Sequence, residues 1–137
     1  MTDTTSSIGA LAEQFLQCVG NRDAEGAGAL FADRVDWYVG GNPALAWTGR
    51  RSRGSDVTAF LNTMWPHFRA GASTATLEQS IINGDDAVIF ASFVHTADNT
   101  GRRFETPVAI HLRASAGRLV LMHLYEDTWA VSHAFFD

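Results

Sequence analysis

Apolar residues recur every three or four positions in two stretches of the first half of the chain. Residues 8–19 carry one apolar stripe, which is typical of a helix packed on a core. Residues 56–69 show the same spacing, and Pro66 within them predicts that this helix kinks or ends near Trp65. A shorter helix is expected between these two, capped at its start by Asp23.

The rest of the chain favours β-structure, because apolar and polar residues alternate as they do in strands with one buried face. The expected strands cover residues 35–39, 74–83, 86–97, 103–115 and 118–129. Turn signals separate the last four strands, at Asn83-Gly84-Asp85, Asn99-Thr-Gly101 and Ser115-Ala-Gly117. Long strands joined this tightly make a strongly bent antiparallel sheet. Residues 130–137 are expected as a short tail, with Phe135 and Phe136 folding back onto apolar surface.

This order of elements predicts an α+β fold. Helices followed by a long antiparallel meander are expected to pack with the helices on one concave face of the sheet. The 137 residues have room for one core, so a single domain over 1–137 is expected. The space between the three N-terminal helices and the sheet can then become a pocket.

Composition excludes some partners. Charged residues make up 18% of the chain, below the roughly 25% of typical domains, which suggests a lined cavity or a subunit contact. The net charge is −5, there is no lysine, and the one dense basic cluster is Arg50, Arg51 and Arg53. A nucleic acid or an anionic membrane is therefore not an expected partner. The single cysteine, Cys18, cannot form an intrachain disulfide.

Neither a targeting segment nor a resident metal is expected. The first seven residues have no basic and no apolar region, and no apolar run approaches the roughly 20 residues that span a bilayer, so the expected location is the cytoplasm. The histidines do not show the spacing of a metal site, and the glycines and arginines of 49–54 lack the Lys-Ser/Thr of a phosphate loop. No cofactor is therefore expected.

Several short motifs, in this order of elements, resemble the nuclear transport factor 2-like superfamily over residues 8–131. They are Leu30-Phe31-Ala32-Asp33, Trp47-Thr-Gly49, Asn83-Gly84-Asp85, Thr100-Gly101-Arg102, Gly117-Arg118-Leu119 and Tyr125-Glu126-Asp127. The members that the chain resembles are ketosteroid isomerase, the SnoaL-like polyketide cyclases and limonene epoxide hydrolase. The resemblance implies a cone-shaped α+β barrel with an apolar pocket between the sheet and the helices. It also implies that the outer sheet face, with His123 and Tyr125, forms a homodimer.

The resemblance assigns catalytic positions that this chain fills with apolar groups. The tyrosine, the base and the oxyanion-holding aspartate of ketosteroid isomerase fall at Phe15, Val39 and Ala109. The His-x-Asp of the SnoaL-like cyclases falls at Met122 and Leu124, and the final-strand acid of the epoxide hydrolase also falls at Leu124. Because these side chains cannot transfer a proton, the known chemistry of the relatives is not expected here.

The same alignment predicts which strand residues face the pocket. The expected apolar walls are Phe15, Trp37, Val39, Trp65, Phe93, Ala109, Met122 and Leu124, and the expected polar groups are His95, His111, Glu126 and Glu105. We interpret His95 or His111 with Glu126 as a candidate acid/base pair, because burial shifts the pKa of both kinds of group. The alternative is that these histidines only fix adjacent strands and that Glu126 pairs with an arginine.

Two functions are compatible with these residues. The first is a SnoaL-like enzyme that isomerises, cyclises or hydrates an apolar metabolite, polycyclic ones included, by cofactor-free acid/base chemistry. The second is a non-catalytic module of the same fold that binds a ligand or only dimerises. The missing catalytic groups of the relatives favour the second function, and the inward-facing histidine and glutamate favour the first.

Overall fold

The computed structural model describes residues 7–136 and contains one six-stranded sheet with four helices. The elements follow the order α1 (Ile8–Gly20), α2 (Ala24–Gly28), β1 (Phe31–Val39), β2 (Gly49–Arg53), α3 (Ser55–Met64), η1 (Trp65–His67), β3 (Thr74–Asn83), β4 (Asp86–Thr96), β5 (Arg103–Ser115), β6 (Arg118–Glu126) and α4 (Thr128–Phe135). Residues 1–6 lie outside the described residues. The expectation about a targeting segment rested mainly on these residues.

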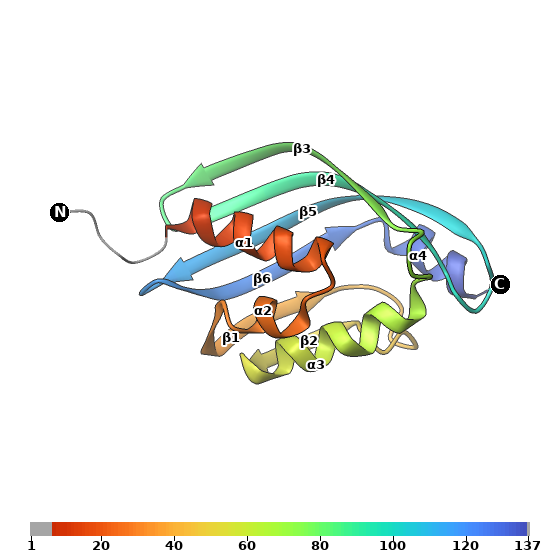
Figure 1. The fold of residues 1–137 in the computed structure, drawn as a ribbon, viewed down its shortest axis with the longest axis horizontal. Coiled ribbons are helices and arrows are strands. Elements are labelled where there is room, and N and C mark those ends of the chain that lie inside the picture. The colour runs from red at the N-terminus through yellow and green to blue at the C-terminus, as the bar shows by residue number, and fades with distance from the viewer. Residues whose placement is uncertain (1–6, 137) are drawn as a thin grey trace.

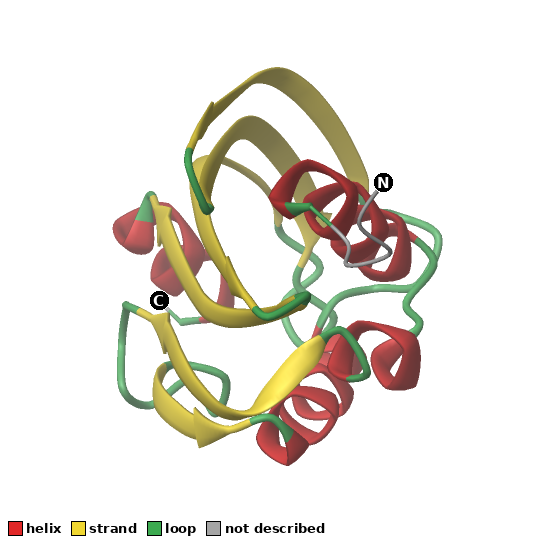
Figure 2. Cartoon of the chain, turned by 90° about the vertical axis from the view of Figure 1, so that its left-hand side faces the viewer, coloured by secondary structure: helices red, strands yellow, loops and turns green. Residues whose placement is uncertain are grey.

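The sheet is long, bent and open at both edges. Its strand order is β2-β1-β6-β5-β4-β3, so β2 and β3 are edge strands. Neighbours pair antiparallel except β1 and β6, which pair parallel, so the sheet is mixed where an antiparallel one was expected. Figure 1 shows α1 lying across the sheet with α2 and α3 beside β1 and β2, and Figure 2 shows how far the strands curve. The predicted α+β architecture with helices on a curved sheet is confirmed.

The helix boundaries follow local capping. Ser7 accepts a hydrogen bond from the backbone N–H of Ala10 and begins α1, as short polar side chains do. The third helix ends at Met64, and Pro66 lies in the 3-10 turn η1, so the predicted break near Trp65 is confirmed.

The last strand is shorter than predicted, because a fourth helix takes up its end. Strand β6 stops at Glu126, and the Asp127 carboxylate accepts a hydrogen bond from the N–H of Ala130. This cap begins α4, so residues 128–135 are helical and not the end of a strand and a short tail. Phe135 is buried, as expected of a side chain folded back onto the core, whereas Phe136 is 40% exposed and the expectation for it is wrong.

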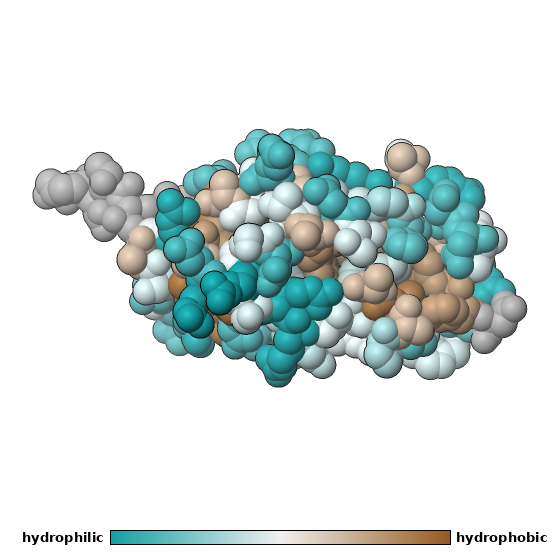
Figure 3. All heavy atoms as spheres, turned by 90° about the horizontal axis from the view of Figure 1, so that it is seen from below, coloured by the Kyte–Doolittle hydropathy of each residue, from teal (hydrophilic) through white to brown (hydrophobic). Residues whose placement is uncertain are grey.

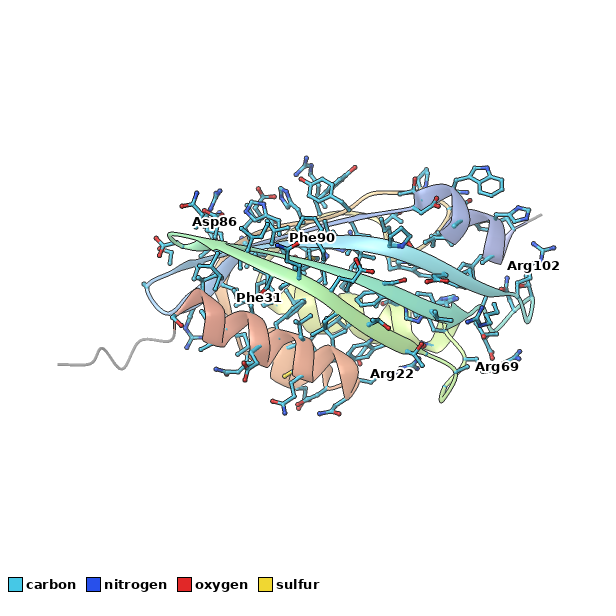
Figure 4. The ribbon with its side chains drawn as sticks, turned by 90° about the horizontal axis from the view of Figure 1, so that it is seen from above. Arg22, Phe31, Arg69, Asp86, Phe90 and Arg102 are labelled. Atoms are coloured by element: carbon cyan, nitrogen blue, oxygen red, sulfur yellow. The ribbon has the colours of Figure 1, made fainter. Side chains whose placement is uncertain are left out.

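Aromatic rings fill one end of the space between the helices and the sheet. Trp37 contacts Phe60, Phe31 and Phe15 edge to face, with ring centroids 4.9, 5.6 and 6.5 Å apart. All four side chains are buried. Phe31 lies between the sheet and the helices in Figure 4. This end of the molecule is therefore solid core, held by apolar burial and edge-to-face contacts.

The predicted facing of β5 is wrong. Its buried residues are the even-numbered ones, from Phe104 to Ala114, whereas Ala109 and His111 lie on the outer face. A shift of one residue moves every side chain of a strand to the other face, so the whole predicted inward set of β5 is reversed. The facing of β4 agrees with the expectation, since Ala87, Ile89 and Ala91 are buried.

No helix among residues 7–136 combines the length and the apolar character that crossing a bilayer requires.

Candidate functional site

A cavity of about 220 Å³ lies at the end of the molecule away from the aromatic core. It is bounded by the end of α1, by α3 and η1, by the start of β3, by β4, β5 and β6, and by α4. Its lining residues are Val19, Gly20, Arg22, Trp47, Met64, Trp65, Phe68, Ser73, Thr74, Ala75, Phe93, His95, Phe104, Leu124, Glu126 and Val131. Figure 3 shows apolar residues gathered at one end of the molecule, the end at which Figure 1 marks the C-terminus. The cavity is mostly apolar, with a few ionisable groups.

Five of the predicted site residues meet in this cavity. Trp65 comes from η1, Phe93 and His95 from β4, and Leu124 and Glu126 from β6. They come together because inward residues on neighbouring strands line one face of a bent sheet.

The remaining predicted wall residues lie elsewhere. Phe15, Trp37, Val39 and Met122 are at most 4% exposed and belong to the packed core. Ala109 faces outward from β5. The resemblance assigned the oxyanion-holding acid to Ala109, but its inward neighbours Val108 and Ile110 are apolar too. No acid therefore stands at this position, whichever of the three residues is compared.

His111 also lies outside the cavity. Its Nε2 is 2.7 Å from Oδ1 of Asp86, and the Nε–H of Arg113 donates to the same oxygen at 2.9 Å. The hydrogen bond from His111, followed by the nearby Arg113, lowers the pKa of Asp86. Figure 4 shows Asp86 and Phe90 on the side of the sheet away from α1. His111 therefore takes part in a charged cluster on the outer face, and Glu105 is likewise exposed there, bonded to Ser92.

Glu126 is the ionisable group with the most unusual environment in the cavity. Burial, with a smaller effect of the neighbouring Asp127 carboxylate, raises the pKa of Glu126 from 4.5 to about 7. No group among residues 7–136 donates a hydrogen bond to its carboxylate oxygens. A carboxyl group with this pKa exists in both protonation states near neutral pH, which is what a general acid or base needs.

His95 is held in an aromatic surrounding as a neutral ring. Its Nδ1 lies 2.8 Å from the Ser73 hydroxyl, and Phe68 stacks on its face. Burial, with a smaller contribution from the positive charge of Arg22, lowers the pKa of His95 from 6.5 to about 4. Neutral imidazole can donate or accept a hydrogen bond, but at neutral pH it does not supply a proton as an acid.

His95 and Glu126 do not form a hydrogen-bonded pair. His95 lies opposite Phe104 of β5, and Glu126 lies opposite Val108 of the same strand. Four residues of strand separate these positions, or roughly 13 Å at about 3.3 Å per residue. The two groups therefore face different parts of any ligand that fills the cavity.

Sequence reasoning missed several lining residues. Phe104 was missed because the facing of β5 was reversed, and Phe68 was predicted to belong to the apolar face of the third helix but follows η1 instead. Trp47 lines the cavity, whereas Trp37, the tryptophan of the first strand that was predicted as a wall residue, lies in the core. Nothing in the sequence singles out Arg22, because its place in the cavity depends on how α1 ends.

The cavity offers little to a metal ion. Across residues 7–136, no three histidine, cysteine, aspartate or glutamate side chains come close enough to hold one. Glu126 and His95 are the ionisable groups on the strands that line the cavity, and they are set apart. The chemistry that this arrangement supports is therefore proton transfer and hydrogen bonding to a ligand.

The solved structures that this chain resembles share its fold over most of its length. A nuclear transport factor 2-like protein of Burkholderia pseudomallei has a TM-score of 0.85 at 21% identity, covering 96% of this chain and 99% of its own. A Catenulispora acidiphila protein with a ketosteroid isomerase-like fold, in complex with trimethylamine, has a TM-score of 0.75 at 13% identity, with 90% of each chain covered. An LEH-like epoxide hydrolase of Mycobacterium tuberculosis has a TM-score of 0.73 at 17% identity, covering 98% of this chain and 89% of its own.

Sequence comparison gives the family. No curated protein sequence matches this chain significantly. The family model described as SnoaL-like domain matches residues 12–122, which span helices α1 to α3 and the sheet up to the middle of β6. Together with the shared fold of the solved structures, this match shows that the chain belongs to the SnoaL-like domain family of the nuclear transport factor 2-like superfamily.

Proposed function

We propose that this protein binds a small, largely apolar metabolite in the cavity and catalyses cofactor-free proton transfer on it through Glu126. The observation that carries the proposal is the half-buried Glu126 carboxyl, which lines an apolar cavity and accepts no hydrogen bond from residues 7–136. Its removal from most of the solvent raises its pKa to about 7. An ionisable group perturbed in this way inside a cavity is a candidate for proton transfer to or from a bound ligand.

The cavity volume limits the size of the ligand. An apolar cavity of about 150 Å³ in another protein holds benzene. The cavity of 220 Å³ here is somewhat larger, and it is walled by Trp47, Trp65, Phe68, Phe93 and Phe104. One or two fused rings fit this volume better than a four-ring steroid. The expected ligand is therefore a mono- or bicyclic compound rather than a large polycyclic one.

The reaction that suits Glu126 is removal of a proton from carbon next to a carbonyl. The carboxylate takes the proton, the electron pair of the C–H bond moves into an enolate, and the neutral Glu126 returns a proton to carbon in the isomeric product. His95, neutral at pH 7, is suited to hydrogen-bond a second polar group of the ligand at the other end of the cavity, away from the enolate formed at Glu126. Isomerisation or cyclisation of an enolisable ketone follows from proton transfer by Glu126.

A bicyclic ketone, 2-tetralone, tests this proposal without the natural substrate. Its binding should raise the melting temperature, since a ligand that binds only the folded state stabilises it by RT ln(1 + [L]/Kd). In D₂O the protein should speed exchange of the ketone's α-hydrogens for deuterium, measured by NMR. Glu126→Gln should lower that exchange rate by a factor of roughly 10² or more while 2-tetralone still binds.

A matched pair of variants tests the location. Leu124→Trp should fill the cavity and abolish binding, whereas Tyr125→Trp places the same side chain at an exposed neighbouring position and should leave binding intact. Equal exchange by wild type and Glu126→Gln would contradict the catalytic role. Failure of mono- and bicyclic compounds to bind would contradict the cavity as a ligand site.

The second candidate function is ligand binding without catalysis. It is favoured by the apolar residues at the positions where relatives carry catalytic groups, and by the lack of a direct contact between His95 and Glu126. The exchange experiment separates the two functions, because a pure binding module binds 2-tetralone without speeding its deuterium exchange.

A further inference from the structure

Arg22 adopts a backbone conformation that arginine rarely takes. Its φ is +53°, in the left-handed region, just beyond the end of α1. Its N–H donates to the carbonyl of Val19 at 3.1 Å, and the N–H of Asp23 donates to that of Cys18 at 2.8 Å. Backbone bonds of this kind close many helices, at a position where glycine is the common residue. The helix end alone therefore does not explain an arginine here.

The side chain of Arg22 reaches the cavity wall. Its Nη1 donates to the carbonyl oxygens of Trp65 and Phe68 at 3.3 and 3.4 Å, and its Nη2 donates to that of Phe68 at 3.4 Å. A guanidinium has five N–H groups. The Nε–H and one N–H of Nη2 have no acceptor among residues 7–136. Figure 4 shows Arg22 projecting from the C-terminal end of α1. Long bonds to two carbonyls hold the group at the cavity and leave donors free.

The charge of Arg22 is not balanced by a carboxylate. No aspartate or glutamate of the described chain forms an ion pair with it, although Arg50, Arg69 and Arg113 each have such a partner. Arg22 lies beside His95, because it donates to the carbonyl of Phe68, whose ring stacks on the imidazole. Its positive charge contributes to the lowered pKa of His95. A half-buried cation beside an apolar cavity without a counter-charge is suited to bind an anion.

We propose that Arg22 is the specificity-determining residue of the cavity and selects ligands in which an apolar ring system carries a carboxylate. The carboxylate would accept the free N–H groups of Arg22 at the end of the cavity next to His95, and the ring would fill the space toward Leu124 and Glu126. This inference rests on the proposed function of the cavity as a ligand site and names the class of ligand.

The separation of the charged groups supports this orientation of the ligand. Arg22 and His95 lie at one end, where both contact Phe68, and Glu126 lies opposite Val108, four residues along β5 from the residue opposite His95. An arylacetate or a similar ring acid bound by Arg22 would point its ring, and not its carboxylate, at Glu126. This orientation avoids repulsion between the carboxylate of the ligand and that of Glu126. It also places ring or side-chain carbon of the ligand next to Glu126, which exchanges protons.

The test compares phenylacetate with its neutral analogue phenylacetamide by isothermal titration calorimetry. Wild-type protein should bind phenylacetate about tenfold or more tightly than phenylacetamide, since hydrogen bonds to a charged partner are the strong ones. Arg22→Gln should remove this preference by weakening phenylacetate alone. Arg22→Lys keeps the charge without the planar fork and should retain part of the preference. Arg69→Gln, which removes an arginine already paired with Asp98, should change nothing.

The outcomes separate this inference from the proposed function. Equal affinity of wild type for the two probes would overturn the role of Arg22 while leaving the cavity as a ligand site. An equal loss of both probes in Arg22→Gln would show that Arg22 only clamps α1 to η1, and a melting temperature measured for each variant identifies a folding defect. Binding of neither probe to wild type would overturn the inference together with the ligand site itself.

Discussion

The imidazole of His95 lies flat on the ring of Phe68, with centroids 4.5 Å apart and an angle of 18° between the planes. Phe93 and Phe104 contact the same imidazole at centroid distances of 5.8 and 5.6 Å. This enclosure keeps water from most of the ring, and Ser73 is the one described residue that shares a hydrogen bond with it. The aromatic surroundings therefore favour the uncharged form, because a cationic imidazolium there would lose its hydration.

His95 should stay neutral well below its ordinary pKa. Its pKa is lowered to about 4, so its imidazole signals in a pH titration by NMR should move only below pH 5. The unfolded chain takes up the proton near pH 6.5, so stability due to neutral His95 is present above that pH and is lost as the pH falls toward 4. Titration of His95 near 6.5 would mean that the ring is hydrated.

Glu126 should make the protein less stable as the pH rises toward neutrality. Its pKa is about 7 in the folded protein and 4.5 in the unfolded chain, so the folded state holds the proton more tightly. There is no penalty below pH 4.5, and the penalty grows up to pH 7, where it reaches about 3 kcal/mol. Glu126→Gln, which cannot ionise, should therefore gain stability relative to wild type between about pH 5 and pH 8 in urea unfolding experiments.

A surface glutamate provides the control for this effect. Glu105 is exposed on the outer face and bonded to Ser92, so Glu105→Gln should follow the wild-type dependence of stability on pH. If Glu126→Gln and wild type lose stability in parallel across this range, the carboxyl of Glu126 is not buried in the way that the cavity requires.

The sequence was a good guide to the elements, and the family resemblance was a poor guide to one strand face. Helical spacing, Pro66 and the turn residues correctly predicted most helices and strands, because these are local signals. The wrong facing of β5 came from the family alignment, which turned Ala109 and His111 inward. The alternation of the strand itself favours the observed facing, because Val108, Ile110 and Leu112 share one face while the charged side chains lie on the other.

Long-range packing explains the rest of the difference. Trp37 and Trp47 are both aromatic residues near the first strand, but Trp37 meets Phe15 and Phe60 while Trp47 meets Phe68 and Phe135. Only the second group leaves a cavity. Which tryptophan lines it depends on the position of α4, an element that the sequence pattern did not predict.

The corrected facing of β5 predicts different effects for two histidines. His111→Ala should leave the affinity for 2-tetralone within about twofold of wild type, because His111 contacts Asp86 on the outer face. His95→Ala should weaken binding by about tenfold or more, because it removes a ring that lines the cavity. Calorimetric titration of both variants measures this contrast. A larger loss of affinity in His111→Ala than in His95→Ala would support the predicted facing of β5, with His111 turned toward the cavity.

We propose that two copies of the chain associate through the outer face of the sheet. The strand register aligns Phe90, Ala109 and Tyr125 in one row across β4, β5 and β6. Phe90 is 37% exposed and Tyr125 is 55% exposed, so two aromatic side chains flank a small residue on an open face. Such a row is suited to contact between copies, since aromatic residues are enriched at protein interfaces.

Tyr125→Glu should weaken this association, because a carboxylate at the centre of an apolar contact loses its hydration without gaining a partner. Trp129→Glu is the control, since Trp129 is 73% exposed on α4 and lies outside the row. Sedimentation velocity over a range of concentrations should show wild type and Trp129→Glu as dimers and Tyr125→Glu shifted toward the 14.9 kDa monomer. Wild type that stays monomeric at every concentration would refute the dimer. Equal dissociation in both variants would place the contact elsewhere on the molecule.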